Sequence, residues 1–417
     1  MVSMRVGILT PYYPPEMGAP PARLHEIATR LVAAGDEVTV ITAYPNRPLG
    51  RIYPGYGGKL HQTTMEDGVR VIRTWIKPSA ASATFIGRAI NDLSFTWSSG
   101  WMVDHIGRLD MLIVQNPPLF SVLNARAIAR RSGAKIVMWC GDIWPDVLVQ
   151  SGQMRDGLMA RIMRINQQMC FNSSVFLAVT NPTIAAETAA NYRCPPIAIW
   201  SNGVDTKMFT PEQRCETVRA SLGASPQDIL VGYIGLHGRF QGLDAIVDAA
   251  IMLKDIPGFR FIFMGEGVEK ARLIERVKAA EANHIVFFDP RPKSAMPALV
   301  ASCDISVVSL LTRMPGTMPS KFYEACAAGS PPLVADGCEA APLVRQHAAG
   351  LIYEPGDATS VKNALLAYRA MTPITKKSMA ESARRLSLRF DRDALASNVR
   401  RCLLAALSGD RLPEQSW

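Results

Sequence analysis

Short apolar, β-branched runs recur along the chain, and each is followed by a longer stretch with helical periodicity. Strands that are apolar throughout are buried on both faces of a sheet, and their alternation with helices is typical of doubly wound parallel sheets. A polar, turn-rich stretch at 202–214 separates two groups of runs. The sequence therefore predicts an α/β protein with two Rossmann-like domains that face each other across a cleft. The predicted strands are 4–10, 37–42, 69–74, 111–115, 135–140, 175–180 and 197–200 in the first group, and 229–235, 260–265, 284–288, 304–309, 332–335 and 351–353 in the second.

Length and composition agree with two globular domains. The chain has 417 residues, of which 48% are hydrophobic and 19% charged. No uncharged apolar run approaches the roughly 18 residues of a membrane span. The eight cysteines are scattered, which favours a reducing cytoplasm over a disulfide framework or a metal site. We therefore expect a cytoplasmic protein without a metal or a cofactor.

The positive charge restricts the choice of partners. The formal net charge is +9, which favours an anionic partner, although a merely basic surface is the alternative. Nucleic acid is disfavoured, because no zinc finger, RNA-binding signature or aromatic-interleaved basic repeat is present. The anionic partners that remain are a phosphate-bearing small molecule and an acidic membrane surface.

A glycine-rich turn follows the first strand of the second group. Gly235, Gly238 and Gly242 lie between this strand and a helical pattern, where backbone amides can approach a phosphate. Tight packing is the alternative explanation for such a cluster. Arg239 within the turn favours a phosphate, and His237 is placed to contact the same ligand.

The stretch 316–336 carries a second indication of an anion. Pro319 suits the first turn of a helix that has Met318 or Thr317 near its N-cap, and Lys321 falls in that turn. A cation there opposes the helix dipole, and an anionic ligand on the same helix end would reverse this. Glu324, one turn later, suits a pair of neighbouring hydroxyls such as those of a ribose, with a solvated helix position as the alternative.

Asp142 directly follows the predicted strand 135–140 and precedes Trp144–Pro145. A carboxylate at a strand end can orient or deprotonate an acceptor hydroxyl, whereas its alternative role is an N-cap of the next helix. The histidines form no rival triad, and His61, His105, His284 and His347 are interpreted as surface or turn positions.

The segment 84–103 combines Phe, Trp and Ile residues with Arg88 and few acidic residues. Such a segment can lie against a membrane interface or hold an acyl tail. A buried amphipathic helix is the alternative.

Residues 11–21, PYYPPEMGAPP, place five prolines around one glycine directly after the first strand. Proline fixes φ and lacks an amide hydrogen, so this stretch is neither a central strand nor a helix interior. It is therefore either a rigid ligand loop in which Gly18 presents its amide, or a stiff structural turn. Glu16 is the single charged side chain of the stretch, and we assign it to acceptor or sugar hydroxyls.

Together these stretches resemble the GT-B glycosyltransferases, and specifically the large retaining glycosyltransferase family 4. The resemblance covers almost the whole chain and follows PYYPPEMGAPPARL, LVAAGDEVTVIT, SNGVDTKMF, the GYIG…QG loop, FMGEG and PSKFYEACAAGSPPLVAD in order. Within the family, the chain is most similar to bacterial enzymes of capsule, O-antigen and exopolysaccharide assembly that transfer fucosamine- or fucose-type sugars.

This resemblance implies an acceptor-binding domain at 1–205, a nucleotide-sugar-binding domain at 206–385, and a C-terminal helix at 386–417 that packs back on the first domain. Glu324 would bind the ribose of the sugar nucleotide. The other residues expected to bind the sugar nucleotide are Gly18, Gly235, His237, Gly238, Gly265, Glu266, Gly267, Arg291, Gly316, Thr317, Met318, Pro319, Ser320 and Lys321, and those expected to bind the acceptor are Glu16, Arg88 and Trp144.

Two departures from the family pattern affect these assignments. The first of two family glutamates falls on Gly316, and Leu236 and Gln241 stand where the wider family has Arg and Lys. Arg239 and Lys321 are the best substitutes for the missing positive charge.

The sequence thus predicts a retaining, metal-independent glycosyltransferase with Asp142, Lys321 and Arg239 as catalytic residues. We expect a nucleoside-diphosphate sugar, with UDP favoured, and a lipid-linked or membrane-proximal glycan acceptor in bacterial surface polysaccharide assembly. The enzyme would be cytoplasmic and peripheral on the inner face of the plasma membrane. A sugar-nucleotide epimerase or hydrolase and a non-catalytic partner subunit are the alternatives.

Overall fold

The structure is a computed structural model that describes residues 3–16, 18–47, 49–78, 85–116, 121–150 and 154–414. Its contacts divide the chain into two compact units. Unit 1 comprises Met1–Asn202 and Asp393–Trp417, and unit 2 comprises Gly203–Arg392.

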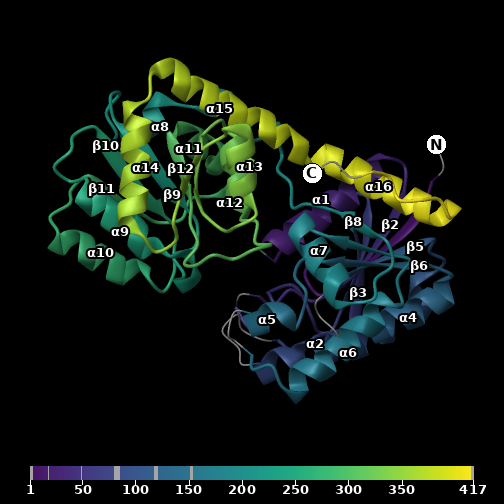
Figure 1. Cartoon of the computed structure of the whole chain (residues 1–417). Coiled ribbons are helices and arrows are strands. Elements are labelled where there is room, and N and C mark those ends of the chain that lie inside the picture. The colour runs from purple at the N-terminus through teal and green to yellow at the C-terminus, as the bar shows by residue number, and fades with distance from the viewer. Residues whose placement is uncertain are drawn as a thin grey trace. The chain divides into compact units, whose positions relative to one another are not determined.

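Unit 1 contains an eight-stranded sheet in the order β3-β4-β2-β1-β5-β6-β7-β8 (Figure 1). Neighbouring strands are parallel except for β3, which pairs antiparallel with β4 at the sheet edge. Successive residues of β5 alternate between the two faces, with Ile113 in one hydrophobic core and Leu112 in the other. The strands are β1 (Arg5–Leu9), β2 (Glu37–Ala43), β3 (His61–Glu66), β4 (Val69–Thr74), β5 (Met111–Asn116), β6 (Lys135–Cys140), β7 (Phe176–Val179) and β8 (Ile197–Ile199).

Helices cover both faces of the unit 1 sheet. One core joins the strands to α1 and to α16, the last helix of the chain, while the other core joins them to α2, α3, α4, α6 and α7. Asp36 fixes α16 in place, because its buried carboxylate accepts a hydrogen bond from Arg400 at 2.8 Å. The helices are α1 (Ala19–Ala33), α2 (Phe85–Gly100), α3 (Val103–Ile106), α4 (Ser121–Ser132), α5 (Asp146–Gln150), α6 (Leu158–Phe171), α7 (Pro182–Asn191) and α16 (Arg392–Ser408).

Unit 2 contains a six-stranded parallel sheet in the order β11-β10-β9-β12-β13-β14. Helix α9 packs against α10 and α14, and α12 packs against α15. The strands are β9 (Ile229–Ile234), β10 (Phe259–Met264), β11 (Ile285–Phe288), β12 (Ile305–Val308), β13 (Pro332–Ala335) and β14 (Leu351–Tyr353). The helices are α8 (Glu216–Ser221), α9 (Leu243–Met252), α10 (Lys270–Ala279), α11 (Met296–Ser302), α12 (Ser320–Ala327), α13 (Ala340–His347), α14 (Ala358–Ala370) and α15 (Pro373–Ser387), with 3₁₀ turns at Pro211–Gln213, Arg239–Gln241, Lys293–Ala295 and Leu388–Phe390.

Every predicted strand is present, and the α/β class with two parallel-sheet domains is confirmed. The prediction missed β3, and His61, which we expected at a surface or turn position, begins this strand. Its sequence, HQTTME, contains no apolar run by which a strand could be predicted. An edge strand with no fully buried residue does not need an apolar run.

Each sheet has a point where the strand order reverses. In unit 1 it lies between β1 and β5, and in unit 2 between β9 and β12. The chain leaves these neighbouring strands toward opposite sides of the sheet, which opens a crevice at their carboxyl ends. In unit 2 this point lies beside the glycine turn and the start of α12.

A buried ion pair in unit 2 allows a test of the fold. Arg219 is 2% exposed and donates hydrogen bonds to Asp304 and to the carbonyl oxygens of Ser302 and Asp228, each at 2.8 Å. We expect Arg219→Met to lower the free energy of unfolding by about 3 kcal/mol, because it leaves a carboxylate and two carbonyls without this partner. The measurement is urea unfolding followed by circular dichroism.

Arg214 provides the matched control, since it binds the same carboxylate at 2.9 Å but is 40% exposed in its side chain. Arg214→Met should cost less than about 1 kcal/mol. Equal losses for the two variants would show that burial does not determine the contribution of these arginines.

Candidate functional site

A small cavity in unit 2 brings together Lys321 and Glu324, which the sequence placed one turn apart. Helix α12 supplies these two side chains, and the switch-point strands β9 and β12 supply most of the other walls. The cavity is lined by Gly232, Ile234, Val300, Ser306, Val307, Lys321 and Glu324. A cation and a carboxylate thus share one cavity at the switch point.

Lys321 lies over the end of β9. Its Nζ is 4.9 Å from the centroid of the Tyr233 ring, so the ammonium contacts an aromatic face. A Cβ atom on Gly235 would lie 2.2 Å from Lys321 Cε, and the φ angle of this glycine is +152°. Burial lowers the pKa of Lys321, and the charge of Glu324 opposes this shift. The backbone conformation therefore favours glycine at position 235, and any side chain there would have to push the end of Lys321 aside.

Glu324 is half-buried in the same cavity. Burial raises its pKa, and the positive charges of Arg392, Lys321 and Lys293 oppose this shift. The carboxylate is thus surrounded by cations, and the alternative of a fully solvated helix position does not describe it.

The first turn of α12 differs from the prediction by one residue. Pro319 is the N-cap, with φ −64° and ψ 132°, and the helix begins at the exposed Ser320. Lys321 is still in the first turn. Met318 is buried, Thr317 accepts a backbone hydrogen bond from Glu339 at 3.1 Å, and Gly316 has φ +72°. Lys321 thus lies at a helix start that no side chain caps.

The glycine turn and the FMGEG turn pack backbone against backbone. A Cβ on Gly265 would lie 1.9 Å from the carbonyl oxygen of Gly235, and one on Gly267 would lie 2.2 Å from that of His237. His237 donates its amide hydrogen to the Glu266 carbonyl at 2.7 Å, and Glu269 donates to the His237 carbonyl at 3.0 Å. Close packing therefore explains the glycines of the second turn, and their proposed contact with a base stays a prediction.

His237 is fully buried between aromatic rings of β9 and β11. Its ring centroid is 5.7 Å from that of Tyr233 and 5.9 Å from that of Phe287. Neither ring nitrogen has a hydrogen-bond partner among the described residues. Burial, followed by the charge of Lys270, lowers the pKa of His237 to about 4. The imidazole is therefore neutral at physiological pH.

The other predicted residues of unit 2 lie outside the cavity. Arg239 is 80% exposed in its side chain, and its nearest carboxylate is Glu269 at 3.6 Å. Glu266 pairs with Lys270 at 3.0 Å, and Arg291 is exposed beyond β11. Gly238 begins the short 3₁₀ turn that carries Arg239. Lys321 is consequently the predicted cation that lines the cavity with Glu324.

In unit 1, the proline-rich loop ends at the start of α1. Gly18 is the N-cap residue, with φ +139°, and Pro20 and Pro21 occupy the first turn. The side chain of Glu16 turns inward, where Oε1 accepts hydrogen bonds from the backbone amides of Asn46 at 2.7 Å and Arg47 at 2.9 Å. Burial raises the pKa of Glu16, and these hydrogen bonds oppose the shift. The carboxylate of Glu16 thus joins this loop to the backbone at Asn46 and Arg47, and its assignment to acceptor or sugar hydroxyls stays a prediction.

Asp142 is exposed just after β6, and Trp144 is half-buried two residues later. The alternative N-cap role of Asp142 does not apply, because α5 begins only at Asp146. Arg23 packs on Trp139, near the end of β6, with its guanidinium carbon 4.2 Å from the centroid of the ring. Arg88 belongs to α2, but its side chain lies outside the described residues.

Sequence reasoning missed two residues that shape these strand ends, Tyr233 and Arg23. Tyr233 appears in the sequence as one apolar residue of a strand, and Arg23 as one residue of an amphipathic helix. No spacing signal distinguishes them, because their contacts with Lys321 and Trp139 join segments far apart in the chain.

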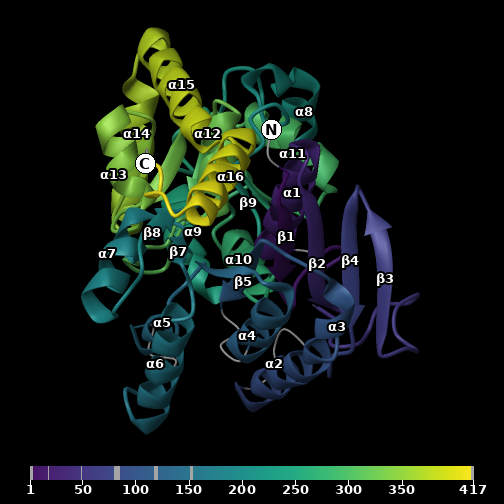
Figure 2. The ribbon, with the colours of Figure 1, turned by 90° about the vertical axis from the view of Figure 1, so that its right-hand side faces the viewer.

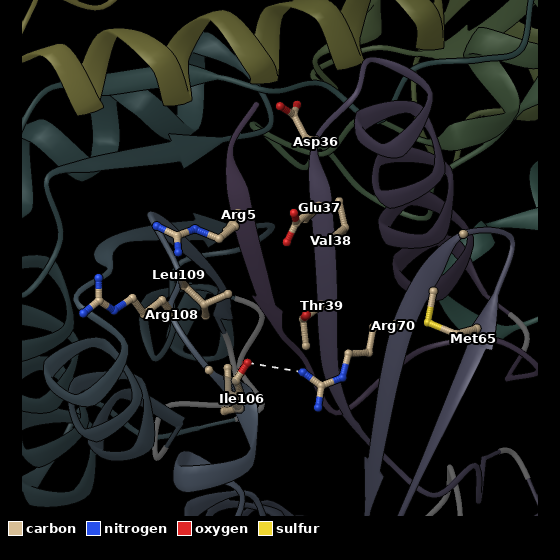
Figure 3. A pocket seen from close by; sticks show the side chains of 12 residues that line it. Arg5, Asp36, Glu37, Val38, Thr39, Met65, Arg70, Ile106, Arg108 and Leu109 are labelled. Carbon is tan, nitrogen blue, oxygen red and sulfur yellow. Dashed lines mark hydrogen bonds between the residues drawn. The ribbon is translucent and has the colours of Figure 1, made fainter. Parts of the chain in front are cut away.

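A larger groove in unit 1 contains none of the predicted site residues. Figure 3 shows it at the amino ends of β1, β2 and β4. Its volume is about 490 Å³. Arg5 pairs with Asp110 at 2.7 Å, and Arg70 donates to the carbonyl oxygens of His105 at 2.9 Å and Ile106 at 3.3 Å. The groove therefore lies at the amino ends of the strands, whereas open parallel sheets bind their ligands at the carboxyl ends.

Two family models match the chain. The model for Glycosyltransferase Family 4 matches residues 22–208, and the model for Glycosyl transferases group 1 matches residues 215–386. Together they span most of the sequence. The chain belongs to the family 4 glycosyltransferases of the GT-B fold, as the motifs predicted.

Individual relatives agree with this class. The chain is 25% identical over 341 residues to the glycosyl transferase WcaI of Escherichia coli (strain K12), whose name assigns it to colanic acid biosynthesis; the match covers 78% of this chain and 82% of WcaI. Sucrose-phosphate synthase of Thermosynechococcus elongatus has the same fold, with a TM-score of 0.76, 16% identity and coverage of 97% and 100% of the two chains. HepE of Anabaena, solved in complex with UDP and glucose, superposes with a TM-score of 0.70 at 16% identity over 96% and 100%.

The buried imidazole predicts a pH dependence of stability. The pKa of His237 is about 4 in the folded chain and near 6.5 in the unfolded chain, so only the unfolded state takes up a proton between these values. Stability is therefore intact above pH 6.5 and falls as the pH decreases toward 4. We expect protonation of His237 in the unfolded state to lower the free energy of unfolding by about 2 kcal/mol at pH 5 relative to pH 7.

His237→Phe should remove that part of the loss, because phenylalanine fits an aromatic pocket and does not titrate. The measurement is the urea midpoint of the native chain and the variant at both pH values. A midpoint that shifts equally in both proteins would refute the prediction, since the remaining titrating groups are shared.

Proposed function

We propose that the protein transfers a sugar from a nucleoside-diphosphate sugar to a hydroxyl of a lipid-linked or membrane-proximal glycan in bacterial surface polysaccharide assembly, with retention of configuration and without a metal ion. The observation that carries this proposal is that Lys321 and Glu324 line one cavity at the switch point of unit 2. The name of WcaI, a polysaccharide glycosyltransferase, supports the pathway.

Lys321 is suited to the diphosphate. Its ammonium is largely withdrawn from water, and no hydrogen bond or ion pair joins it to another described residue. A cation held partly out of water without a carboxylate in an ion pair with it is costly, and a phosphate oxygen would reduce this cost. The backbone of Gly316, Thr317 and Met318 and the start of α12 at Ser320 would provide further donors to the same group.

Glu324 is suited to the ribose. A carboxylate accepts hydrogen bonds from two neighbouring hydroxyls, and the nearby positive charges of Arg392, Lys321 and Lys293 favour its ionised form. UDP is the favoured nucleotide, and the complex of HepE with UDP supports this choice. The turns at Gly265, Gly267 and Arg291 would flank the base.

In the transfer step, the bond between the anomeric carbon and the diphosphate oxygen breaks while the acceptor oxygen attacks from the same face. The acceptor proton passes to the leaving diphosphate. Lys321 stabilises the charge that develops on this group, with Arg239 as a second, exposed cation. Asp142 orients the acceptor hydroxyl with Trp144 nearby, and Gly18 offers its amide to the sugar or the distal phosphate.

Removing the lysine tests the catalytic assignment. Lys321→Ala should lower turnover of the sugar nucleotide at least about 100-fold, because one electrostatic contact to the developing charge is lost. The measurement is release of nucleoside diphosphate across a panel of UDP- and GDP-sugars. The control is Lys278→Ala, since this lysine is 68% exposed on α10 and pairs only with Glu275 among the described residues.

Unchanged turnover in Lys321→Ala would overturn the assignment of this residue. Turnover that continues without any acceptor and yields an isomerised or hydrolysed sugar nucleotide would favour the epimerase or hydrolase. Absence of binding to every sugar nucleotide would favour a non-catalytic subunit.

A second experiment tests the ribose contact separately from catalysis. Glu324→Gln should weaken UDP binding about tenfold or more, because a charged hydrogen bond contributes about 1.5–3 kcal/mol. For 2′,3′-dideoxy-UDP, the native chain and the variant should bind with equal affinity. The measurement is titration calorimetry, and an equal loss for both nucleotides would place Glu324 away from the ribose.

A further inference from the structure

Helix α6 of unit 1 is apolar on two sides. One side is buried, with Ala160, Met163, Gln167, Cys170 and Phe171 facing the core. The other side carries a second stripe that is exposed to solvent. Its members and their exposed fractions are Leu158 76%, Met159 54%, Ile162 52%, Ile165 56% and Met169 40%. Because these positions recur every three or four residues, they form one continuous strip along the helix.

Helix α2 carries a similar strip that ends in tryptophans. Ile90 and Leu93 are 50% and 47% exposed, and Trp97 and Trp101 are 55% and 66% exposed. The rings of Trp97 and Trp101 are 5.8 Å apart, and Trp75 lies 6.5 Å from Trp97, each pair packed edge to face. Three tryptophans thus form one cluster that remains largely in contact with water.

The two strips belong to one layer of helices. The core on this face of the sheet includes Phe95 of α2, Ile128 of α4 and Phe171 of α6. Helix α4 packs against α2, and Arg126 of α4 donates to the Met169 carbonyl of α6 at 3.1 Å. Figures 1 and 2 both show α2, α4 and α6 on the same side of the unit 1 sheet. Leu123 of α4 is 57% exposed between them.

Arginines accompany this apolar layer. Arg130 of α4, Arg155 just before α6 and Arg161 on α6 are exposed, and no ion pair joins them to another described residue. The acidic side chains nearby are already paired, since Asp156 binds Arg164 at 2.7 Å and Asp104 binds Arg131 at 2.8 Å. The layer therefore presents exposed apolar side chains together with positive charge that has no counterion on the described chain.

We propose that the outer surface of α2, α4 and α6 docks on an anionic lipid bilayer. Tryptophan rings and aliphatic side chains partition into the interface between headgroups and acyl chains, and arginines beside them bind lipid phosphates. An ordinary protein partner does not require unpaired arginines around an apolar strip, whereas anionic headgroups complement both features. No helix among the described residues is long and apolar enough to cross a membrane. The contact is thus one of helices lying on the surface, and it does not depend on the proposed transfer reaction.

Vesicle flotation tests this inference with the full chain and without any sugar nucleotide. We expect the protein to float with phosphatidylcholine vesicles that contain phosphatidylglycerol, to float less with phosphatidylcholine alone, and to dissociate as salt increases. Ile162→Ser combined with Ile165→Ser should lower vesicle affinity about tenfold or more, and so should Trp97→Ser combined with Trp101→Ser.

Ile374→Ser is the matched control, because this residue is 82% exposed on α15 of unit 2 and belongs to neither strip. It should leave vesicle affinity unchanged. Circular dichroism and UDP affinity equal to those of the native chain would show that the patch variants are folded. These two readouts also separate failure of the docking surface from failure of the proposed function.

Three results would overturn the inference. The first is that the native chain fails to float with anionic vesicles. The second is that both patch variants float as the native chain does. The third is a lipid-free dimer that Ile162→Ser combined with Ile165→Ser converts to a monomer, which would assign the strip to contact between copies of this chain.

Discussion

The contact between the half-buried Lys321 ammonium and the Tyr233 ring is the interaction on which the candidate site depends. It lies above the Tyr233 ring and over Gly235, where any side chain would overlap it. An aromatic face returns only about 0.5–2 kcal/mol to a cation, which is far less than the cost of withdrawing a charge from water. The negative charge of Glu324 offsets a further part of this cost. The remaining deficit is the physical reason for proposing that an anion binds at this site.

The backbone beneath the lysine is built from two glycine-containing turns. The chain leaves β9 at φ +152°, a conformation that favours glycine at position 235, and runs directly beside the turn after β10. There the Gly265 and Gly267 backbones approach the Gly235 and His237 carbonyls more closely than any side chain allows. The two turns are therefore one packed unit. A side chain at Gly265 or Gly267 would displace the backbone of the other turn.

Much of this arrangement follows from the sequence, and the exceptions have physical causes. Buried parallel strands are apolar throughout, so their positions could be predicted, as could the turns that follow them. The polar edge strand β3 carries no such signal. Glu16 was assigned to acceptor or sugar hydroxyls because it is the single charged side chain among the prolines, yet the loop folds its carboxylate onto the amides of Asn46 and Arg47. Tyr233 could not be identified as a contact of Lys321, because tertiary packing alone joins them.

The net positive charge is a further property whose location could not be predicted from the sequence. A net charge of +9 indicates an anionic partner but gives no position for it. In unit 2, many exposed arginines are neutralised locally; Arg272 and Arg276, for example, share Asp244. What remains is of two kinds, a desolvated lysine in a narrow cavity and solvated arginines around exposed tryptophans and aliphatic side chains. We assign the first to the phosphates of a sugar nucleotide and the second to an extended layer of headgroups, so one excess of charge is consistent with two different anions.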